Sequence, residues 1–344
     1  MAFWSRQKDS DFFEIAELII SGVFPIALIV VGTIGNVLSA IILLNKQNRQ
    51  TSTNIYLIFL CCVDTLSLYQ WNLRDAAYEF TDGRQQISNQ SVFLCICQQF
   101  LAFYTLHASA MFLTLVALDR ACLLWSRWYK QKIARARVAV MIGIVIFILL
   151  FGINGFLFGL GYEYSYYDNT TATYVTIVTC SSSTNPNITQ FFYNVYPWIH
   201  LVIMYLLPFT LMIFCTIISA RKLIVRQTSV NQQITTNAQR NRRISIMLLL
   251  MCFTYIILTL PNRLCFSVFV TELIGHDYSD TVFLLSNTLM YTRSALNVFF
   301  LYISVYGFQR DVRRLFSKCY GWTGNRVAPR QGIMEEQIGT IIRL

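Results

Sequence analysis

Seven long apolar stretches constrain the fold of this chain more than any other feature. A helix that crosses a lipid bilayer needs about 20 predominantly apolar residues, and these stretches are continuous rather than alternating. Continuous stretches favour helices over a transmembrane barrel. The second is short, and we expect it to continue toward Tyr78. The seven stretches are 18–44, 55–69, 92–118, 138–160, 192–220, 244–270 and 281–306.

Composition excludes most soluble classes of protein. Only 13% of the 344 residues are charged and 55% are hydrophobic, whereas soluble domains carry roughly 25% charged residues. A cytosolic enzyme, a disordered chain and a nucleic-acid-binding module all fit this composition poorly. We therefore predict an all-α membrane protein, a bundle of seven transmembrane helices.

The distribution of basic residues predicts the orientation of the bundle. Of the 27 Lys and Arg residues, 20 lie in the segments 45–53, 121–137, 221–243 and 308–344. Four lie in the segments that would face the other side. Because cytoplasmic loops are enriched in Lys and Arg, we expect an extracellular N-terminus and a cytoplasmic C-terminus at the plasma membrane. The net charge of +10 then reflects topology and contact with anionic lipid headgroups.

Glycosylation acceptors agree with this orientation. The sequons begin at Asn89, Asn169 and Asn187, and all three fall in segments assigned to the outside. The stretch 18–44 is too long for the apolar core of a signal peptide, so we interpret it as a first span.

The predicted domain limits follow from these assignments. We expect an extracellular segment 1–17, a seven-helix domain 18–306, an amphipathic helix 307–319 and a cytoplasmic tail 320–344.

The segment after the seventh stretch has the pattern of a helix lying in the membrane interface. Phe308, Val312 and Leu315 recur at helical spacing, and the basic side chains fall on the opposite face. Cys319 at its end is a candidate for palmitoylation.

Several polar and helix-bending residues interrupt the apolar stretches. A charged side chain at a bilayer centre costs about 2.5–3.5 kcal/mol, and a proline within a helix removes a backbone hydrogen bond. Taken alone, each of these residues could have a functional role or could simply pack between helices. They are Asn36, Asp64, Asp119, Arg120, Pro208, Pro261 and Asn297.

Taken together, these residues resemble the motifs of the rhodopsin-like (class A) G-protein-coupled receptor family. The resemblance covers the chain from about Ile20 to Cys319. Its elements, in order, are Gly35-Asn36-Val37, Leu60 with Asp64, Cys95 placed 25 residues before Arg120, Asp119-Arg120, Pro208, Leu260-Pro261 and Ser294 to Asn297.

The resemblance implies a role for several of these residues. Cys95 and Cys180 would form an extracellular disulfide, although Cys97, two residues further on, competes with Cys95. Asp119 would hold Arg120 until activation releases the arginine toward a heterotrimeric G protein.

The same resemblance implies a polar core with a sodium ion. Asp64, Ser109 and Asn297, with Asn36 nearby, look like the family's sodium pocket, and we expect no other cofactor and no metal site. Arg293 lies one turn before Asn297. An arginine that reached Asp64 would neutralise it and make the sodium ion redundant.

The chain departs from the family pattern at positions that normally carry the activation relay. We therefore expect a weakly latched resting state with appreciable basal signalling. The departures are Ala121 after Asp-Arg, no tryptophan between Arg137 and Leu160, Thr216 and Thr259 at aromatic positions, Asn241 in place of an acid, and Asn297 followed by no proline and by a late Tyr302.

Two ligand classes are excluded by single positions. An opsin needs a lysine in the seventh helix, and 280–306 contains none. Amine receptors carry an aspartate 18 residues before the switch arginine, where this chain has Ala102.

Lipid and odorant ligands remain open, but the outer segments favour a peptide ligand. Two β-prone runs, 162–167 and 171–179, are joined by a turn signal and predict a hairpin like that of the family's peptide receptors, although a mobile glycosylated loop is an alternative. We predict a neuropeptide-like ligand, and expect the pocket to be formed by Ala102, Tyr104, Tyr205, Asn262, Arg263 and Tyr291.

A seven-span transporter or a ligand-gated channel is the competing class. Transporters often show internal repeats, and this chain shows none. An enzyme is disfavoured, because the histidines at 107, 200 and 276 are scattered and no catalytic motif accompanies them.

Overall fold

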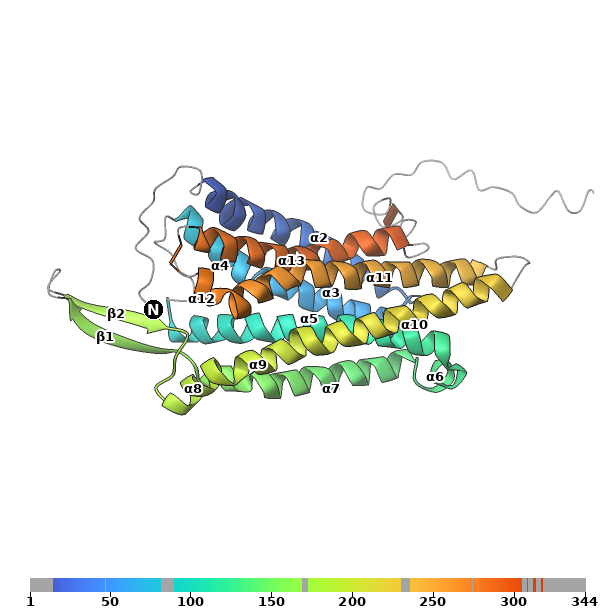
Figure 1. The fold of residues 1–344 in the computed structure, drawn as a ribbon, viewed down its shortest axis with the longest axis horizontal. Coiled ribbons are helices and arrows are strands. Elements are labelled where there is room, and N and C mark those ends of the chain that lie inside the picture. The colour runs from blue at the N-terminus through green and yellow to red at the C-terminus, as the bar shows by residue number, and fades with distance from the viewer. Residues whose placement is uncertain are drawn as a thin grey trace, which may run out of the picture.

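The computed structural model describes residues 15–46, 48–81, 90–168, 173–229, 236–273, 275–276 and 278–304, together with 308, 312, 313 and 317. Long helices lie side by side in one elongated bundle, and a two-stranded hairpin projects from one end (Figure 1). The predicted sites Asn89, Asn169 and Cys319 lie outside the described residues, as does most of the predicted amphipathic helix 307–319.

The first half of the chain forms the helices that carry Asn36, Asp64 and Asp119. Its elements are the π-helix η1 (Leu18–Val23), α2 (Phe24–Leu43), α3 (Ser52–Leu68), α4 (Trp71–Phe80), α5 (Val92–Trp125), α6 (Arg127–Lys132), α7 (Ala136–Asn154) and the 3₁₀-helix η3 (Gly155–Gly159).

The second half begins with the hairpin and ends with the helix that closes the bundle against α2. Its elements are β1 (Tyr162–Asp168), β2 (Thr173–Thr179), α8 (Pro186–Asn194), α9 (Tyr196–Leu201), the π-helix η4 (Val202–Leu206), α10 (Leu207–Ser229), α11 (Thr236–Arg263), the π-helix η5 (Leu264–Val268), α12 (Val270–Leu273) and α13 (Ser279–Ser304).

Six helical segments among the described residues are long and apolar enough to cross a membrane. They coincide with the first six predicted stretches, and the second continues past Tyr78 as predicted. They are Ile15–Leu43, Ser52–Phe80, Val92–Trp125, Ala136–Gly159, Pro186–Lys222 and Leu249–Phe266.

The seventh predicted stretch corresponds to α13, which packs against α2, α3 and α11. Its 26 residues are enough to cross a bilayer. It carries Arg293, Asn297 and several hydroxyl side chains, which lower its hydropathy. That α13 forms a seventh span therefore stays a prediction.

Wide helical turns lie beside the prolines that the sequence marks as bends. The π-helix η4 ends two residues before Pro208, and η5 begins three residues after Pro261. Proline cannot donate a hydrogen bond and displaces the carbonyl group one turn before it, and η4 lies at this place relative to Pro208, whereas η5 follows Pro261. Both helices are thus irregular where hinges were predicted.

The predicted hairpin is confirmed, and a disulfide ties it to the bundle. β1 and β2 pair antiparallel, with Tyr162 opposite Thr179 and Tyr167 opposite Tyr174. Cys95, near the start of α5, is bonded to Cys180, which directly follows β2, with 5.4 Å between their Cα atoms. Cys97 keeps a free thiol, so the competing pairing is not formed.

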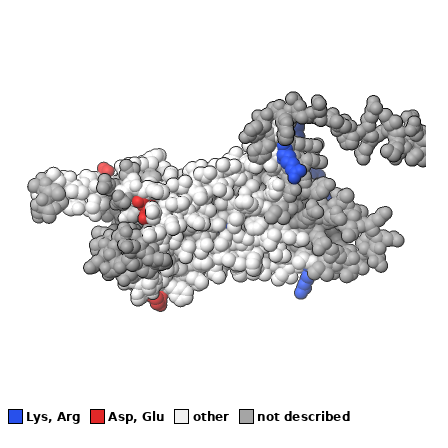
Figure 2. Space-filling view, turned by 90° about the horizontal axis from the view of Figure 1, so that it is seen from above, with Lys and Arg blue, Asp and Glu red and all other residues white. Residues whose placement is uncertain are grey.

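Charge divides the surface into three zones. Figure 2 shows a wide central band without charged side chains, acidic side chains toward the hairpin end and basic side chains toward the opposite end. This banded surface is what a bundle surrounded by hydrocarbon requires, because charged groups are costly at the depth of the lipid tails.

Candidate functional site

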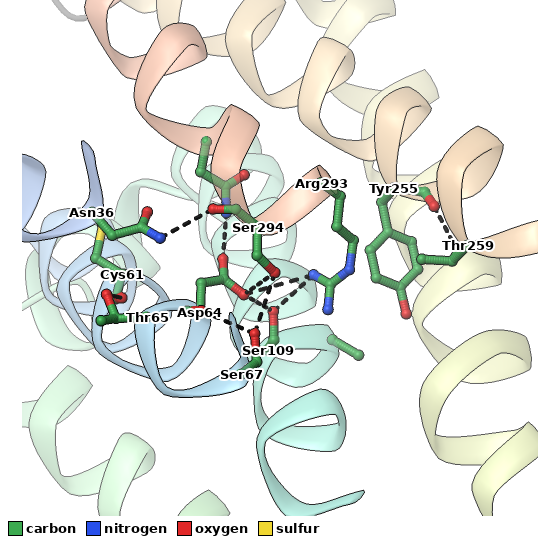
Figure 3. A network of polar contacts seen from close by, with 12 residues as sticks. Asn36, Cys61, Asp64, Thr65, Ser67, Ser109, Tyr255, Thr259, Arg293 and Ser294 are labelled. Atoms are coloured by element: carbon green, nitrogen blue, oxygen red, sulfur yellow. Dashed lines mark hydrogen bonds and ion pairs between the residues drawn. The ribbon is translucent and has the colours of Figure 1, made fainter. Parts of the chain in front are cut away.

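A buried polar cluster surrounds Asp64 at the centre of the bundle (Figure 3). The carboxylate is 0% exposed. Its Oδ1 accepts hydrogen bonds from the hydroxyl groups of Ser109, at 2.5 Å, and Ser294, at 3.0 Å, and its Oδ2 accepts one from the Asn297 amide. Asn36 donates to the carbonyl oxygen of Ser294 at 3.0 Å. Helices α2, α3, α5 and α13 therefore meet at this carboxylate.

Arg293 enters the same cluster from α13. Its Nη1 donates to Ser109 Oγ at 2.8 Å and lies 3.8 Å from Asp64 Oδ1. The Arg293 side chain is 4% exposed, so its positive charge is buried beside the carboxylate. An ion pair buried in this way balances the charge that the membrane interior disfavours.

These groups do not fit the sodium ion that the resemblance implies. While Arg293 donates to Ser109, the serine hydroxyls and the Asn297 amide approach Asp64 as donors, so they direct hydrogen atoms rather than lone pairs toward the carboxylate. A second cation would also be repelled by the guanidinium group, by about 4 kcal/mol at 4 Å and an effective dielectric of 20.

The residues of the predicted switch lie at the end of α5 that is far from the hairpin. Asp119 Oδ1 accepts hydrogen bonds from the hydroxyl groups of Ser52, at 2.7 Å, and Tyr129, at 2.8 Å, and its Oδ2 accepts one from Thr53. Both carboxylate oxygens are therefore occupied by neutral donors from α3 and α6.

Tyr129 keeps its proton in this contact. Burial, and then the negative charge of Asp119, raise the pKa of the Tyr129 hydroxyl above its ordinary value. The tyrosine is therefore a donor, and the carboxylate an acceptor, throughout the physiological range of pH.

The half of the bundle nearer the hairpin contains four of the residues predicted to bind ligand. The guanidinium carbon of Arg263 lies 4.5 Å from the centre of the Tyr205 ring, a cation–π contact. Asn262 donates to Asn287 Oδ1 at 2.6 Å. Tyr205 and Tyr291 belong to one buried apolar cluster.

Two other predicted pocket residues are placed differently. The hydroxyl group of Tyr104 donates to the Phe147 carbonyl oxygen at 3.2 Å, and its ring stacks on Phe100 at 5.1 Å, so the side chain packs toward α7. Ala102 is 2% exposed and offers only a methyl group to its surroundings.

Sequence reasoning missed a second buried polar chain, between α5, α7 and α9. His107 Nε2 lies 2.7 Å from His200 Nδ1, and His107 Nδ1 lies 3.1 Å from Asn154 Oδ1. The Tyr196 hydroxyl donates to the same amide oxygen at 2.5 Å. Asn154 could have indicated these contacts from the sequence, because an amide in an otherwise apolar span usually bonds to another helix.

The comparison with protein families agrees with the motifs and the helical bundle. The family model described as 7 transmembrane receptor (rhodopsin family) matches residues 35–300. No curated protein matches the chain. The matched range contains the Asp64 cluster, Asp119 with Arg120, and Arg263. The chain therefore belongs to the rhodopsin family of seven-transmembrane receptors, whose members are multi-pass membrane receptors.

Proposed function

We propose that this receptor lies in the plasma membrane with its N-terminus outside, binds an extracellular peptide at the hairpin end and activates a heterotrimeric G protein at the opposite end. The observation that carries the proposal is the position of Arg263 over Tyr205, within the outer half of a rhodopsin-family bundle. The remaining observations support it independently.

The chemistry of the outer half favours a peptide over a small apolar ligand. A guanidinium group stacked on an aromatic ring holds its N–H groups in a fixed plane, a geometry that suits a carboxylate or a backbone carbonyl group. Beside it, Asn262 and Asn287 present amide groups that can bond to a peptide backbone.

The hairpin adds an aromatic surface for the same ligand. Tyr164, Tyr166 and Tyr174 are 46%, 45% and 77% exposed, and the disulfide between Cys95 and Cys180 fixes the base of the hairpin against α5. Tyrosines combine a large apolar ring with a hydrogen-bonding hydroxyl group, and they are enriched at binding interfaces.

The opposite end has the charge expected of a cytoplasmic face. Its basic segments favour this end facing anionic lipid headgroups, and Asp119 with Arg120 lies there. Exposure of Asn187 at the start of α8 is compatible with glycosylation on the outside, which we propose also for Asn89 and Asn169. We propose that Cys319 is palmitoylated.

Nucleotide exchange on added G proteins tests the proposal directly. Membranes from cells expressing the receptor are exposed to a peptide library, and exchange of guanine nucleotide is measured on each G-protein class. At least one peptide should stimulate exchange, and Arg263→Gln should reduce its potency by roughly tenfold or more. Substrate flux into vesicles without any stimulated exchange would contradict the proposal.

A matched control separates recognition from general damage. Arg74 is also an outer arginine, but it is paired with Asp75 at 2.8 Å and is not part of the proposed contact. Arg74→Gln should leave the potency of the peptide nearly unchanged. Epitope tags at the two ends, detected on opposite faces of intact cells, would support the orientation, and detection on one face would contradict it.

A further inference from the structure

The cation that balances Asp64 is part of the chain itself. Figure 3 shows the Arg293 side chain extending from α13 toward Asp64 and Ser109, with Tyr255 of α11 on its other side. Ser109 donates to the carboxylate and accepts from Arg293. The hydroxyl group thus joins the two charges, and no separate ion is needed between them.

The guanidinium group also contacts the helix on the far side of the cluster. Its Cζ lies 5.0 Å from the centre of the Tyr255 ring, and the Tyr255 hydroxyl donates to the carbonyl oxygen of Met204 in η4. Arg293 therefore lies between the carboxylate on α3 and an aromatic ring on α11, and that ring is bonded to the irregular turn before α10.

Two of the donor groups of Arg293 are not used by these contacts. Nε and Nη2 are buried and have no hydrogen-bond partner among the residues that the structure describes. Leaving buried donors unsatisfied is unfavourable, so the position of the side chain is not explained by hydrogen bonding alone. The opposite charge of Asp64 and the Tyr255 ring account for it.

We propose that Arg293 is a built-in counter-ion of Asp64, which makes the stability of this receptor independent of sodium and couples the polar core to α11 through Tyr255. A diffusible ion occupies its site only in proportion to its concentration. A guanidinium group that belongs to the chain is present at any salt concentration. Because Arg293 contacts Tyr255, a movement of α11 would change the position of this charge. The inference concerns the Asp64 cluster and does not depend on the proposed ligand or G protein.

Thermal unfolding of the purified full-length receptor tests the inference without any ligand. The melting temperature is measured in detergent with sodium chloride and with choline chloride at equal ionic strength. The wild-type receptor should melt at the same temperature in both salts. A saturable stabilisation of the wild-type receptor by sodium that Asp64→Asn abolishes would overturn the proposal.

Variants at the two charged positions give the complementary result. Arg293→Ser should lower the melting temperature in choline by about 5 °C or more, because it leaves a buried carboxylate without its counter-ion, and sodium should restore part of the loss. The double variant Asp64→Asn with Arg293→Ser should recover stability in both salts, which also guards against Arg293→Ser failing to fold.

The ion pair of Arg74 with Asp75 supplies the matched control. It joins the same two residue types on α4, with side chains that are 30% and 11% exposed. Arg74→Ser should change the melting temperature little and should create no dependence on sodium. Equal behaviour of the Arg74→Ser and Arg293→Ser variants in the two salts would also overturn the proposal.

Discussion

The hydroxyl group of Tyr129 lies 2.8 Å from Oδ1 of Asp119 and thereby ties α6 to the inner end of α5. Together with Ser52 and Thr53, it fills both oxygens of the carboxylate with neutral donors. The three hydrogen bonds join α3, α5 and α6 at one buried carboxylate. We propose that this contact holds the resting state as a latch made of hydroxyl groups.

Removing one hydroxyl group from this latch should raise basal signalling. Tyr129→Phe keeps the ring and deletes one hydrogen bond to a charged acceptor, a bond worth about 1.5–3 kcal/mol. We expect basal nucleotide exchange to rise roughly threefold or more at equal surface expression. Trp128→Phe, a change at a neighbouring ring that is 62% exposed, should leave it unchanged. An equal response of the two variants would contradict the latch.

The effect of Tyr129→Phe should not depend on pH in the physiological range. Burial and the charge of Asp119 raise the pKa of the Tyr129 hydroxyl. A raised pKa means that the stabilising contact is fully present below the unfolded value of about 10 and is lost only as pH rises through the folded value. The ratio of basal exchange between variant and wild type should therefore be equal at mildly acidic and mildly alkaline pH.

Apolar length was sufficient to predict the helices, and motif spacing was sufficient to predict the cluster at Asp64. A charged or polar side chain within an apolar stretch is costly unless it has a partner. Asp64 could therefore be identified from the sequence as a candidate functional residue. The partners of Asp119 could not be predicted in this way, because Ser52 and Thr53 at a helix start and Tyr129 in the short helix α6 are ordinary residues at such places. Only the packing of three segments brings them to one carboxylate.

The contacts of Tyr104 and Asn154 could not be predicted from the sequence for a related reason. Each lies on a helix whose rotation about its axis decides which neighbour it meets, and apolar runs without strong periodicity do not fix that rotation. The Tyr104 hydroxyl group donates to the Phe147 carbonyl oxygen of α7, and Asn154 contacts His107 and Tyr196.

A close approach between α2 and α13 depends on Gly35. A β-carbon at this position would lie 2.5 Å from Cγ1 of Val298, so Gly35→Ala should destabilise the receptor by about 1–3 kcal/mol through overpacking. The melting temperature of the purified receptor measures this loss. Combining it with Val298→Ala should recover part of the stability, since two of the crowding methyl groups are removed.

Gly152 of α7 is the matched control for that substitution. A β-carbon there meets no atom within 4 Å, and alanine is favoured over glycine within a helix. Gly152→Ala should keep or raise the melting temperature. A loss equal to that of Gly35→Ala would show that the close approach to Val298 is not the cause.

The disulfide at the base of the hairpin should be required for stability, and the neighbouring free thiol should not. Cys180→Ser opens a bond that spans 85 residues and should cost about 2–4 kcal/mol, seen as lower surface expression and an earlier melting transition. Cys97→Ser should match wild type in both measurements. An equal loss in the two variants would indicate that Cys97, rather than Cys95, pairs with Cys180.

The amide oxygen of Asn154 is a shared acceptor in the buried polar contacts between α5, α7 and α9. Substitutions here measure how strongly this one acceptor stabilises the three helices. Its amide oxygen receives the Tyr196 hydroxyl and faces His107 Nδ1, and its amide nitrogen donates to the Leu150 carbonyl oxygen. That last bond fixes the orientation of the amide, so His107 has to donate through Nδ1 and use Nε2 as the acceptor toward His200. Asn154→Leu leaves two buried donors without their acceptor.

We expect Asn154→Leu to destabilise the receptor by about 2–4 kcal/mol, because each unsatisfied buried group costs about 1–3 kcal/mol. Tyr196→Phe removes only one donor from the same oxygen, and it should cost about 1 kcal/mol. Melting temperatures of the two variants, measured side by side in one detergent, should therefore fall in that order. Equal losses would mean that the contact with His107 contributes nothing, and that the chain is held by Tyr196 alone.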